Sequence, residues 1–303
     1  VMARFDRLDN ETERNNFKTI WQDATDYVHI RRNEIISRKQ KGSQRTEKVY
    51  DSTAIRSNDL LASSLQGSLT SNSALWAKIK IAGDDFNSDD AVRGWLDGTS
   101  TAMFRAFNDS NYTLEMAEFF LDLTSVHTAC VLIEEDTIEK RGFNGLNFRA
   151  YPIMDYVFEE NHKGIVDTVI RKCTFTGRQA KQKSGDKAGK KVLQAAKKGD
   201  EQSFNYLHLV MPIKEYGGGR FGNPGWKFTD VYISCEDEVI TRKGGYFEFP
   251  YVVARWAKAS GEKYGRGPTN NALPDIKTLN AAISYMLQAW AKDINPSRLV
   301  PDS

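Results

Sequence analysis

The apolar residues of the first 130 positions recur every three or four residues, which is the spacing of amphipathic helices. Four helices are predicted on this ground, with their apolar sets at Phe17 to Val28, Ile55 to Leu69, Val92 to Phe107 and Leu114 to Thr124. Asp51 or Ser52 is the expected N-cap of the second helix, because a short oxygen side chain accepts from the free amides of a first turn. The acidic segment 83–90 is expected to lead into the third helix, and Trp76 to Ile81 alternates like a strand.

Short β-rich runs replace this pattern in the middle of the chain. Strands are expected within 129–133, 148–151, 156–158, 166–173, 206–210, 231–235 and 251–256. The segment 161–164, Asn-His-Lys-Gly, predicts a hairpin turn. Pro268 to Pro274 introduces a last helix, which carries apolar residues from Ile276 to Trp290 and ends at Asn295-Pro296. Helices, then strands, then a helix predict an α+β fold.

Composition narrows the class of protein without identifying a function. The 303 residues are 40% hydrophobic and 27% charged, which is ordinary for a globular protein and too apolar for general disorder. No apolar run approaches the roughly 20 residues that cross a bilayer, so no membrane partner is expected. Three widely spaced cysteines form neither a disulfide framework nor a metal-ligand pair.

The strongest charge feature lies at 171–198, where ten Lys or Arg stand against one Asp. This segment carries a net charge of +9 in a chain whose formal net charge is only +2, so the other residues carry −7. The candidate contact residues for DNA or a partner protein are Arg178, Lys181, Lys183, Lys187, Lys190, Lys191, Lys197 and Lys198. The competing interpretation is a solvated or disordered loop, because blocks of like charge extend and stay mobile.

The sequence contains no motif that identifies a catalytic residue. The segment 185–191 resembles a phosphate-binding loop but has three residues instead of four between its glycines, and Lys191 follows the lysine where Ser or Thr is needed. The four histidines have no paired spacing, and His127 is expected to be a hydrogen-bonded core residue. The acidic pair Asp89-Asp90 favours a helix N-terminus over a cation site, and so does Asp84-Asp85. We therefore expect no enzyme activity, no cofactor and no metal.

Two stretches resemble the portal, or head-to-tail connector, proteins of short-tailed, T7-like bacteriophages. The first runs from Tyr50 through Leu61 and Leu65 to Trp76, and the second from Pro250 to Asn280. The positions that carry the resemblance are Tyr50, Asp51, Ser52, Trp76, Arg255, Trp256, Tyr264, Gly265, Gly267, Pro268, Pro274, Asp275, Leu279 and Asn280. The likeness covers nearly the whole chain, although the chain stops near residue 303 where family members continue into more wing helices and a crown.

The resemblance implies a portal-like division of the chain. Residues 1–110 would form a helical wing-like region, 111–130 a candidate stem helix, 131–258 a β-rich region that includes the clip, and 259–303 a second candidate stem helix with the segment after it. The helices expected to line the channel are 114–126 and 272–292.

The same resemblance implies a function and its partners. Twelve copies would form a ring at one capsid vertex, through which double-stranded DNA is packaged and ejected. Terminase would dock first and a tail or adaptor protein later, with contacts to the major capsid or scaffold protein. The location would be the virion, after assembly in the host cytoplasm.

A DNA channel must not bind its DNA tightly, and a near-neutral chain with one basic segment suits that role. Ring closure also explains why no site is apparent within one chain, since a heterologous interface makes the function collectively. Two alternatives stay open from the residues alone: a nucleic-acid-processing enzyme that holds substrate with 171–198, and another virion adaptor protein.

Overall fold

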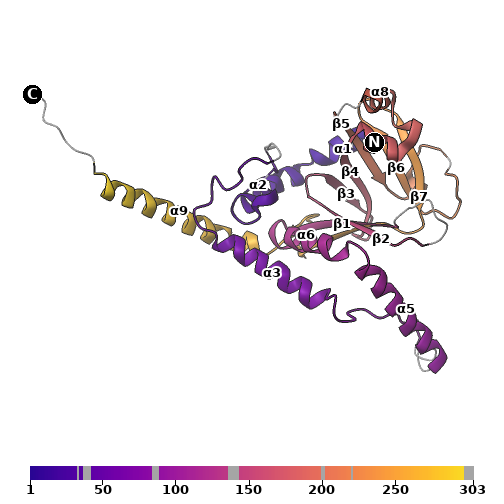
Figure 1. Ribbon diagram of the computed structural model, residues 1–303, viewed down its shortest axis with the longest axis horizontal. Helices are drawn as coiled ribbons and strands as arrows, with labels where there is room; N and C mark the ends of the chain where they lie inside the picture. Colours follow the sequence, from indigo (N-terminus) through magenta and orange to yellow (C-terminus); the bar gives the residue numbers. More distant parts are fainter. Residues whose placement is uncertain are drawn as a thin grey trace, which may run out of the picture. The chain divides into compact units, whose positions relative to one another are not determined.

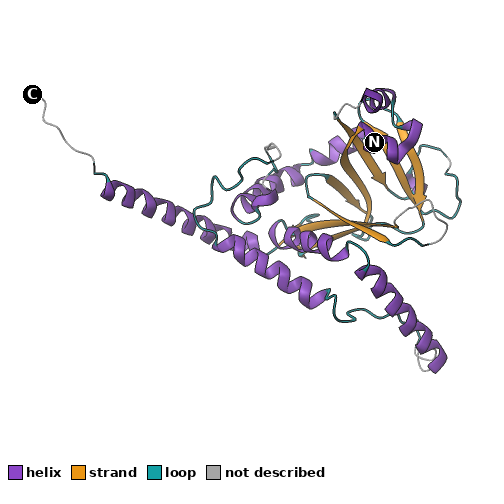
Figure 2. Cartoon of the chain, viewed as in Figure 1, coloured by secondary structure: helices purple, strands orange, loops and turns teal. Residues whose placement is uncertain are grey.

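The computed structural model describes residues 1–32, 34–36, 42–83, 89–135, 143–198, 202–219 and 221–296. The chain divides into two compact units. Unit 1 contains Val1–Asn15, Asn72–Phe119 and Ala129–Ala254, and unit 2 contains Asn16–Ser71, Phe120–Thr128 and Arg255–Ser303. Figure 1 labels the helices and strands, and Figure 2 separates them by colour. The mixture of helices and antiparallel sheets confirms the predicted α+β class.

Five of the described α-helices follow the predicted order, and three more, at residues 2–9, 177–184 and 190–198, were not predicted. The helices are α1 Met2–Asp9, α2 Thr12–Tyr27, α3 Thr53–Leu69, α5 Asp90–Asn108, α6 Tyr112–Ser125, α7 Gly177–Ser184, α8 Lys190–Lys198 and α9 Pro268–Ile294, with short 3-10 turns at Ile30–Arg32, Gly185–Lys187 and Ile213–Glu215. Asp89 caps α5 by accepting from the Ala91 amide, as expected for an acid at a helix start. Residues 84–88, including Asp84 and Asp85, lie outside the described residues.

The strands form three sheets. They are β1 Thr128–Glu135, β2 Leu146–Tyr151, β3 Tyr156–Glu160, β4 Val166–Thr176, β5 Ser203–Val210, β6 Phe228–Ser234, β7 Ile240–Tyr246, β8 Tyr251–Arg255, β9 Ala257–Lys258 and β10 Gly265–Arg266. The largest sheet is antiparallel with the order β3-β4-β5-β6-β7, and β2-β1-β8 form a second sheet. Gly164 has a φ of 74° and its amide bonds to the Asn161 carbonyl, so the predicted hairpin turn between β3 and β4 is confirmed.

The five-stranded sheet of unit 1 is covered on both faces because its strands are apolar on both. On one face, Phe5 and Leu8 of α1 pack on Val157, Ile170 and Leu209. On the other face, α7, α8 and the turn between them pack on Cys173, Phe204, Tyr206 and Tyr232 through the buried residues Ala180, Ala188, Val192 and Ala195. Residues on the two faces alternate along each strand, as a period of two requires.

Two predictions about local structure are wrong. Trp76 to Ile81 is not a strand within the described residues. It runs along α5, where the Trp76 ring packs on Phe104 and Phe107 and the Ile79 amide donates to Ser100 Oγ at 3.0 Å. The alternation therefore reflects one side of an extended segment facing a helix. The loop interpretation of 171–198 is also wrong, because the segment continues β4 and then forms α7 and α8.

Candidate functional site

The basic segment forms a helical hairpin, defined here as residues 177–198 of α7, the 3-10 turn Gly185–Lys187 and α8. Seven of the eight predicted contact residues are exposed on this basic hairpin: Arg178, Lys181, Lys187, Lys190, Lys191, Lys197 and Lys198. Lys191 Nζ donates to the Glu236 carbonyl oxygen at 3.2 Å. These seven side chains therefore share one helical hairpin, and their contact with DNA or a partner protein stays a prediction.

The hairpin is anchored to the sheet by specific contacts. The Thr176 side chain accepts from the Gln179 amide and Gln179 Oε1 accepts from the Thr176 amide, so a reciprocal capping box starts α7. Gly177 faces the backbone of Ala196, where an added Cβ would lie 2.9 Å from the Ala196 nitrogen, so glycine permits the close approach of the two helices. Tyr206 Oη donates to the Ala188 carbonyl at 2.8 Å. The basic side chains thus stand on a fixed support.

Three basic residues of the segment point into unit 1 instead of outward. Arg171 is 4% exposed, with its Nε 3.1 Å from Tyr251 Oη and its guanidinium carbon 4.1 Å from the centre of the Tyr151 ring. Lys172 Nζ lies over the Phe5 ring at 4.4 Å. Lys183 Nζ donates to Tyr232 Oη at 2.8 Å, and burial lowers the pKa of this lysine. Lys183 is therefore placed as a packing residue of the sheet face.

A buried polar network crosses the same sheet. His208 stacks on the Tyr232 ring at 4.1 Å, and its Nε2 and Nδ1 lie 3.1 Å from Asp230 Oδ1 and 2.8 Å from Tyr251 Oη. Burial lowers the pKa of His208 to about 4. Burial by itself would raise the pKa of Asp230, but the hydrogen bond with His208 and the Arg242 guanidinium lower it. Since His208, Asp230 and Tyr251 are each at most 3% exposed, we interpret the network as core packing of unit 1.

The two family-like stretches meet in unit 2 through one amide side chain. Asn280 Oδ1 accepts from the amides of Tyr50 and Asp51 at 2.7 and 3.1 Å, and its Nδ2 donates to the Lys48 carbonyl at 2.9 Å. Asp51 Oδ1 in turn accepts from the Thr53 amide at 3.0 Å, while Ser52 precedes α3 without a side-chain cap. Asn280 therefore fixes the start of α3 against α9, and residues 50–71 and 255–280 of the two stretches both belong to unit 2.

Most of the remaining family-like positions contact His127 or belong to α9. Trp256 N donates to the His127 carbonyl at 3.0 Å, and Arg255 Nη1 lies 3.4 Å from the Lys263 carbonyl. Tyr264 is fully buried, with its ring 5.0 Å from Trp21 and 5.5 Å from Phe17. Pro268 is the first residue of α9, and Pro274 lies inside this helix. Trp76 alone of these positions belongs to unit 1.

Gly265 and Gly267 are required by close packing against His127. A Cβ on Gly265 would lie 2.1 Å from the His127 carbonyl oxygen, and one on Gly267 would lie 2.4 Å from His127 Nδ1. We expect Gly265→Ala to destabilise unit 2 by about 2–3 kcal/mol or more, because a backbone oxygen cannot move aside as a flexible side chain can. Gly261→Ala is not a suitable control because its φ is positive, whereas Gly94 in α5 has open space around it. Chemical denaturation of both variants measures the difference, and equal stability for Gly265→Ala and Gly94→Ala would contradict it.

His127 is a buried, neutral histidine, as the sequence predicts. It is fully buried at a φ of 62°, and its Nε2 lies 3.0 Å from Asn270 Oδ1, so Nε2 carries the proton. Among the residues that the structure describes, Nδ1 has no hydrogen-bond partner. Burial lowers the pKa of His127 to about 4, although the hydrogen bond to Asn270 raises it in part.

This pKa predicts loss of stability in acid. Between pH 6.5 and about 4 the unfolded chain binds a proton at His127 that the folded chain does not, so the free energy of unfolding falls as pH falls through this window. The expected contribution is about 2–3 kcal/mol at pH 4.5 relative to pH 7.5. Urea denaturation of the wild type and His127→Gln at both pH values measures it, with exposed His162→Gln as the control. A pH dependence unchanged in His127→Gln would contradict the prediction.

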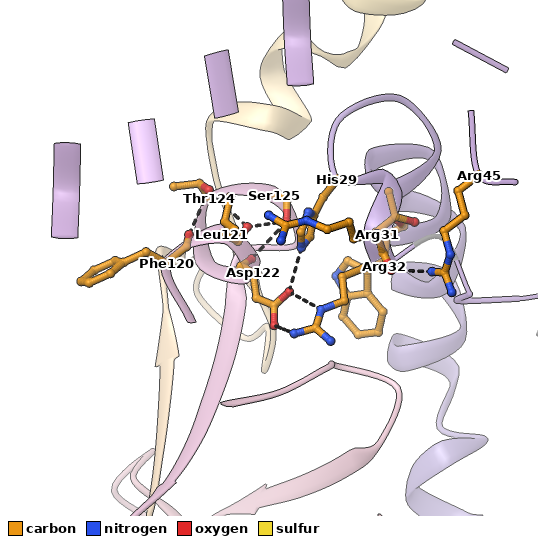
Figure 3. Close-up of polar contacts among 11 residues, drawn as sticks. His29, Arg31, Arg32, Arg45, Phe120, Leu121, Asp122, Thr124 and Ser125 are labelled. Atoms are coloured by element: carbon orange, nitrogen blue, oxygen red, sulfur yellow. Dashed lines mark hydrogen bonds and ion pairs between the residues drawn. The ribbon is translucent and has the colours of Figure 1, made fainter. Parts of the chain in front are cut away.

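A second buried cluster in unit 2 centres on Asp122, which is 2% exposed. Its Oδ1 and Oδ2 lie 3.1 and 3.2 Å from Nε and Nη2 of Arg32, and Oδ1 lies 3.4 Å from His29 Nε2 (Figure 3). Arg45 donates to the Arg31 carbonyl beside this cluster and pairs with Glu34. The bidentate geometry fixes the segment 29–32 on the C-terminal turn of α6.

Helix α9 carries an apolar stripe that continues past its covered part. The α9 stripe consists of Ala272, Ile276, Leu279, Ile283, Met286, Trp290 and Ile294, which follow one another at spacings of three or four. Met286, Trp290 and Ile294 are 46%, 55% and 84% exposed. A helix of 27 residues is about 40 Å long, and all residues from 285 to its end are exposed.

The N-terminal end of the stripe borders a pocket within unit 2. The pocket has a volume of about 310 Å³ and is lined by α3 and the first turns of α9. Ala272, Asp275, Ile276 and Leu279 contribute from α9. Asn58, whose Nδ2 has no hydrogen-bond partner in the described part of the chain, contributes from α3. The predicted positions Asp275 and Leu279 therefore lie on the same surface as the stripe.

Neither a metal-binding cluster nor a membrane-spanning helix occurs among the described residues. No group of three or more His, Cys, Asp and Glu side chains there is placed to bind a metal ion. No helix among those same residues is long and apolar enough to span a bilayer.

Comparison with known proteins gives one consistent result. The whole chain, residues 1–303, matches the sequence profile of a family described as bacteriophage head to tail connecting protein. It is 24% identical over 299 residues to the portal protein of Salmonella phage epsilon15, a match that covers 97% of this chain and 53% of that protein. It is 23% identical over 309 residues to the probable portal protein of Bordetella phage BPP-1, covering 100% of this chain and 54% of that one. The chain thus spans about half the length of these curated relatives.

Proposed function

This chain belongs to the bacteriophage head to tail connecting proteins, and on that premise we propose that it forms part of a portal subunit. In this proposal twelve copies close into a ring at one capsid vertex, and double-stranded DNA passes through the ring during packaging and ejection. The match of the whole chain to the family and the portal proteins among its relatives support this role.

The observation that carries the proposal is the uncovered α9 stripe. A Trp, a Met and an Ile exposed in line on one helix have a large free-energy cost in water, of roughly 1.5–3 kcal/mol for each side chain that could be buried. A second copy of the chain is the occupant that we propose for this face. In a heterologous contact, the stripe of one subunit meets a different surface of the next subunit. Such contacts close into a ring when the rotation between neighbouring copies divides a full turn into equal steps.

The charge distribution supports passage of DNA. Outside 171–198 the chain carries a net charge of −7, so most of its surface does not attract phosphates. A ring lined by many basic groups would bind the backbone strongly at low salt and slow its sliding. A subunit with its positive charge confined to one segment suits a conduit.

The partners follow from the same proposal. Terminase docks on the ring during packaging, a tail or adaptor protein replaces it, and the major capsid or scaffold protein surrounds it. The ring is assembled in the host cytoplasm and remains in the virion. We propose a structural role without catalysis, because no described group of residues favours the enzyme alternative.

The division into wing, stem and clip remains a prediction. Of the two candidate stem helices, α6 is largely buried by its own chain, with Tyr112, Met116, Phe119, Phe120 and Leu121 all less than 10% exposed. Helix α9 is exposed for its last 10 described helical residues, 285–294. We therefore propose α9 as the helix that packs against neighbouring subunits, and residues 297–303 of the second stem prediction lie outside the described residues.

The proposal is tested by the mass of the purified full-length protein in light scattering. We expect one particle with the mass of a closed ring, independent of dilution over a wide range. A monomer at all concentrations would contradict the proposed function.

A further inference from the structure

We propose that the basic hairpin is a docking surface for the phosphate backbone of duplex DNA, which it binds without reading sequence. This inference rests on the proposed function for the choice of DNA. It goes further by assigning the contact to α7 and α8 and not to the helix that we propose for subunit packing.

The exposed basic side chains of the hairpin form no ion pairs within the described residues, although the Asp237 carboxylate faces Gly189 and Lys191 Nζ donates to the Glu236 carbonyl. None of its seven exposed Lys and Arg side chains forms an ion pair with a described carboxylate, and Asp186 is the one acid among residues 177–198. Elsewhere in the same unit, basic side chains do pair: Arg4 and Arg7 with Glu159, Lys78 with Asp97, and Arg242 with Asp230. A solvated face that served only solubility would be expected to mix both signs of charge.

The chemistry of the exposed side chains favours a phosphate backbone over a protein partner. The exposed positions of the hairpin that are not Lys or Arg are Gln179, Gln182, Gly185, Asp186 and Gln194. The apolar residues Ala180, Ala188, Val192 and Ala195 are buried against the sheet. Stable protein interfaces use buried aromatic or aliphatic anchors and are depleted in Lys, and this surface has the opposite composition.

The same composition favours duplex over single-stranded DNA. Proteins that bind single strands stack bases on aromatic side chains, and no aromatic residue occurs in 177–198. Six of the seven basic residues are Lys, which bind phosphate as point charges and lack the planar fork that reads guanine. The hairpin therefore suits sequence-independent contact with the phosphate backbone better than base stacking or base recognition.

The dimensions of the hairpin suit several phosphate contacts. Helices of eight and nine residues are about 12 and 14 Å long. Duplex DNA carries about one phosphate charge per 1.7 Å of its axis, so a surface of this length faces several phosphates at once. Because the capping box and the sheet contacts hold the hairpin in place, little ordering is needed when DNA binds.

The test compares two variants of the full-length protein that lose the same charge. Lys181→Gln, Lys187→Gln and Lys190→Gln remove three positive charges from the hairpin, and Lys80→Gln, Lys163→Gln and Lys214→Gln remove three from exposed lysines elsewhere in unit 1. Binding to 30-base-pair duplexes of two unrelated sequences is measured from 50 to 200 mM salt. We expect the hairpin variant to bind about tenfold or more weakly at 50 mM, with a slope of log affinity against log salt that is smaller by about 2–3. The control variant should keep the wild-type slope, and both duplex sequences should bind equally.

Three results would overturn the inference. The first is an equal loss of DNA affinity in the two triple variants, and the second is tighter binding of a single strand than of a duplex. The third is a hairpin variant that keeps its DNA affinity but is no longer retained on polyglutamate, which would indicate an acidic protein partner. Light scattering on the same samples separates this inference from the proposed function. Rings with unchanged DNA affinity in the hairpin variant would contradict the hairpin assignment alone, whereas a monomeric wild type would contradict the ring.

Discussion

Trp290→Glu combined with Ile294→Glu is expected to convert the assembled ring into monomers. Both side chains are more than half exposed in the single chain, so the substitutions leave the fold of one subunit intact. In the assembly the same positions would bury two carboxylates in an apolar contact. Burying unpaired charges costs several kcal/mol at each subunit interface, and a closed ring contains one such interface for every subunit.

A matched pair on the polar side of α9 provides the control. Gln288→Glu with Lys292→Gln changes the charge by the same two units on the same exposed helix segment, away from the stripe. Light scattering should give rings for this control and monomers for the stripe variant, with the same helix content for both by circular dichroism. Rings from both would mean that the other half of the subunit or another protein covers the stripe, and the interface proposal would be wrong.

Asp122→Ala is expected to lower the free energy of unfolding by about 3–5 kcal/mol. The substitution leaves the Arg32 guanidinium and the His29 ring without the carboxylate they face, and an uncompensated buried group is costly. The segment 29–32 would lose its link to α6 (Figure 3). Chemical denaturation at one fixed protein concentration measures the loss, since the stability of an oligomer depends on concentration.

An exposed ion pair is the control for Asp122. Lys78 Nζ and Asp97 Oδ1 are 3.4 Å apart with both side chains more than half exposed, so Asp97→Ala should cost less than about 1 kcal/mol. A loss at Asp122 no larger than the loss at Asp97 would show that the cluster does not hold unit 2 together.

The sequence pattern predicts most elements because local periodicity determines them. Apolar stripes on α2, α3, α5 and α6 and the runs of β1, β4 and β5 have enough length to be recognised without tertiary information. Strand β7, Ile-Thr-Arg-Lys-Gly-Gly-Tyr, was not predicted because its apolar content is low and two glycines interrupt it. It becomes a strand through its pairing with β6, which is a long-range effect.

The basic hairpin contains local helix signals, but its high net charge favoured a loop in the sequence analysis. Thr176 and Gln179 have the spacing of a capping box, and the Ala, Gln and Lys residues that follow favour a helix. A charge block of +9 favours extended chain when it is solvated on all sides. Here Ala180, Val192 and Ala195 provide an apolar face that packs on the sheet, and this packing outweighs repulsion among the lysines.

The family-like positions could be named from sequence, but their physical roles could not. Asn280 contacts residues 48, 50 and 51, and the glycines at 265 and 267 face residue 127, so each role depends on a neighbour more than a hundred positions away. The Asp122 cluster has no sequence signature at all, since a single Asp in an apolar helix gives no indication of its partners at 29 and 32. The function itself would be collective, and a single chain contains only one side of each interface.

Negative-stain microscopy of the purified full-length protein determines whether the subunits form a portal ring. We expect top views of a closed ring with twelvefold symmetry and a central channel wide enough for a DNA duplex. Particles without a channel, or open filaments in place of rings, would contradict it.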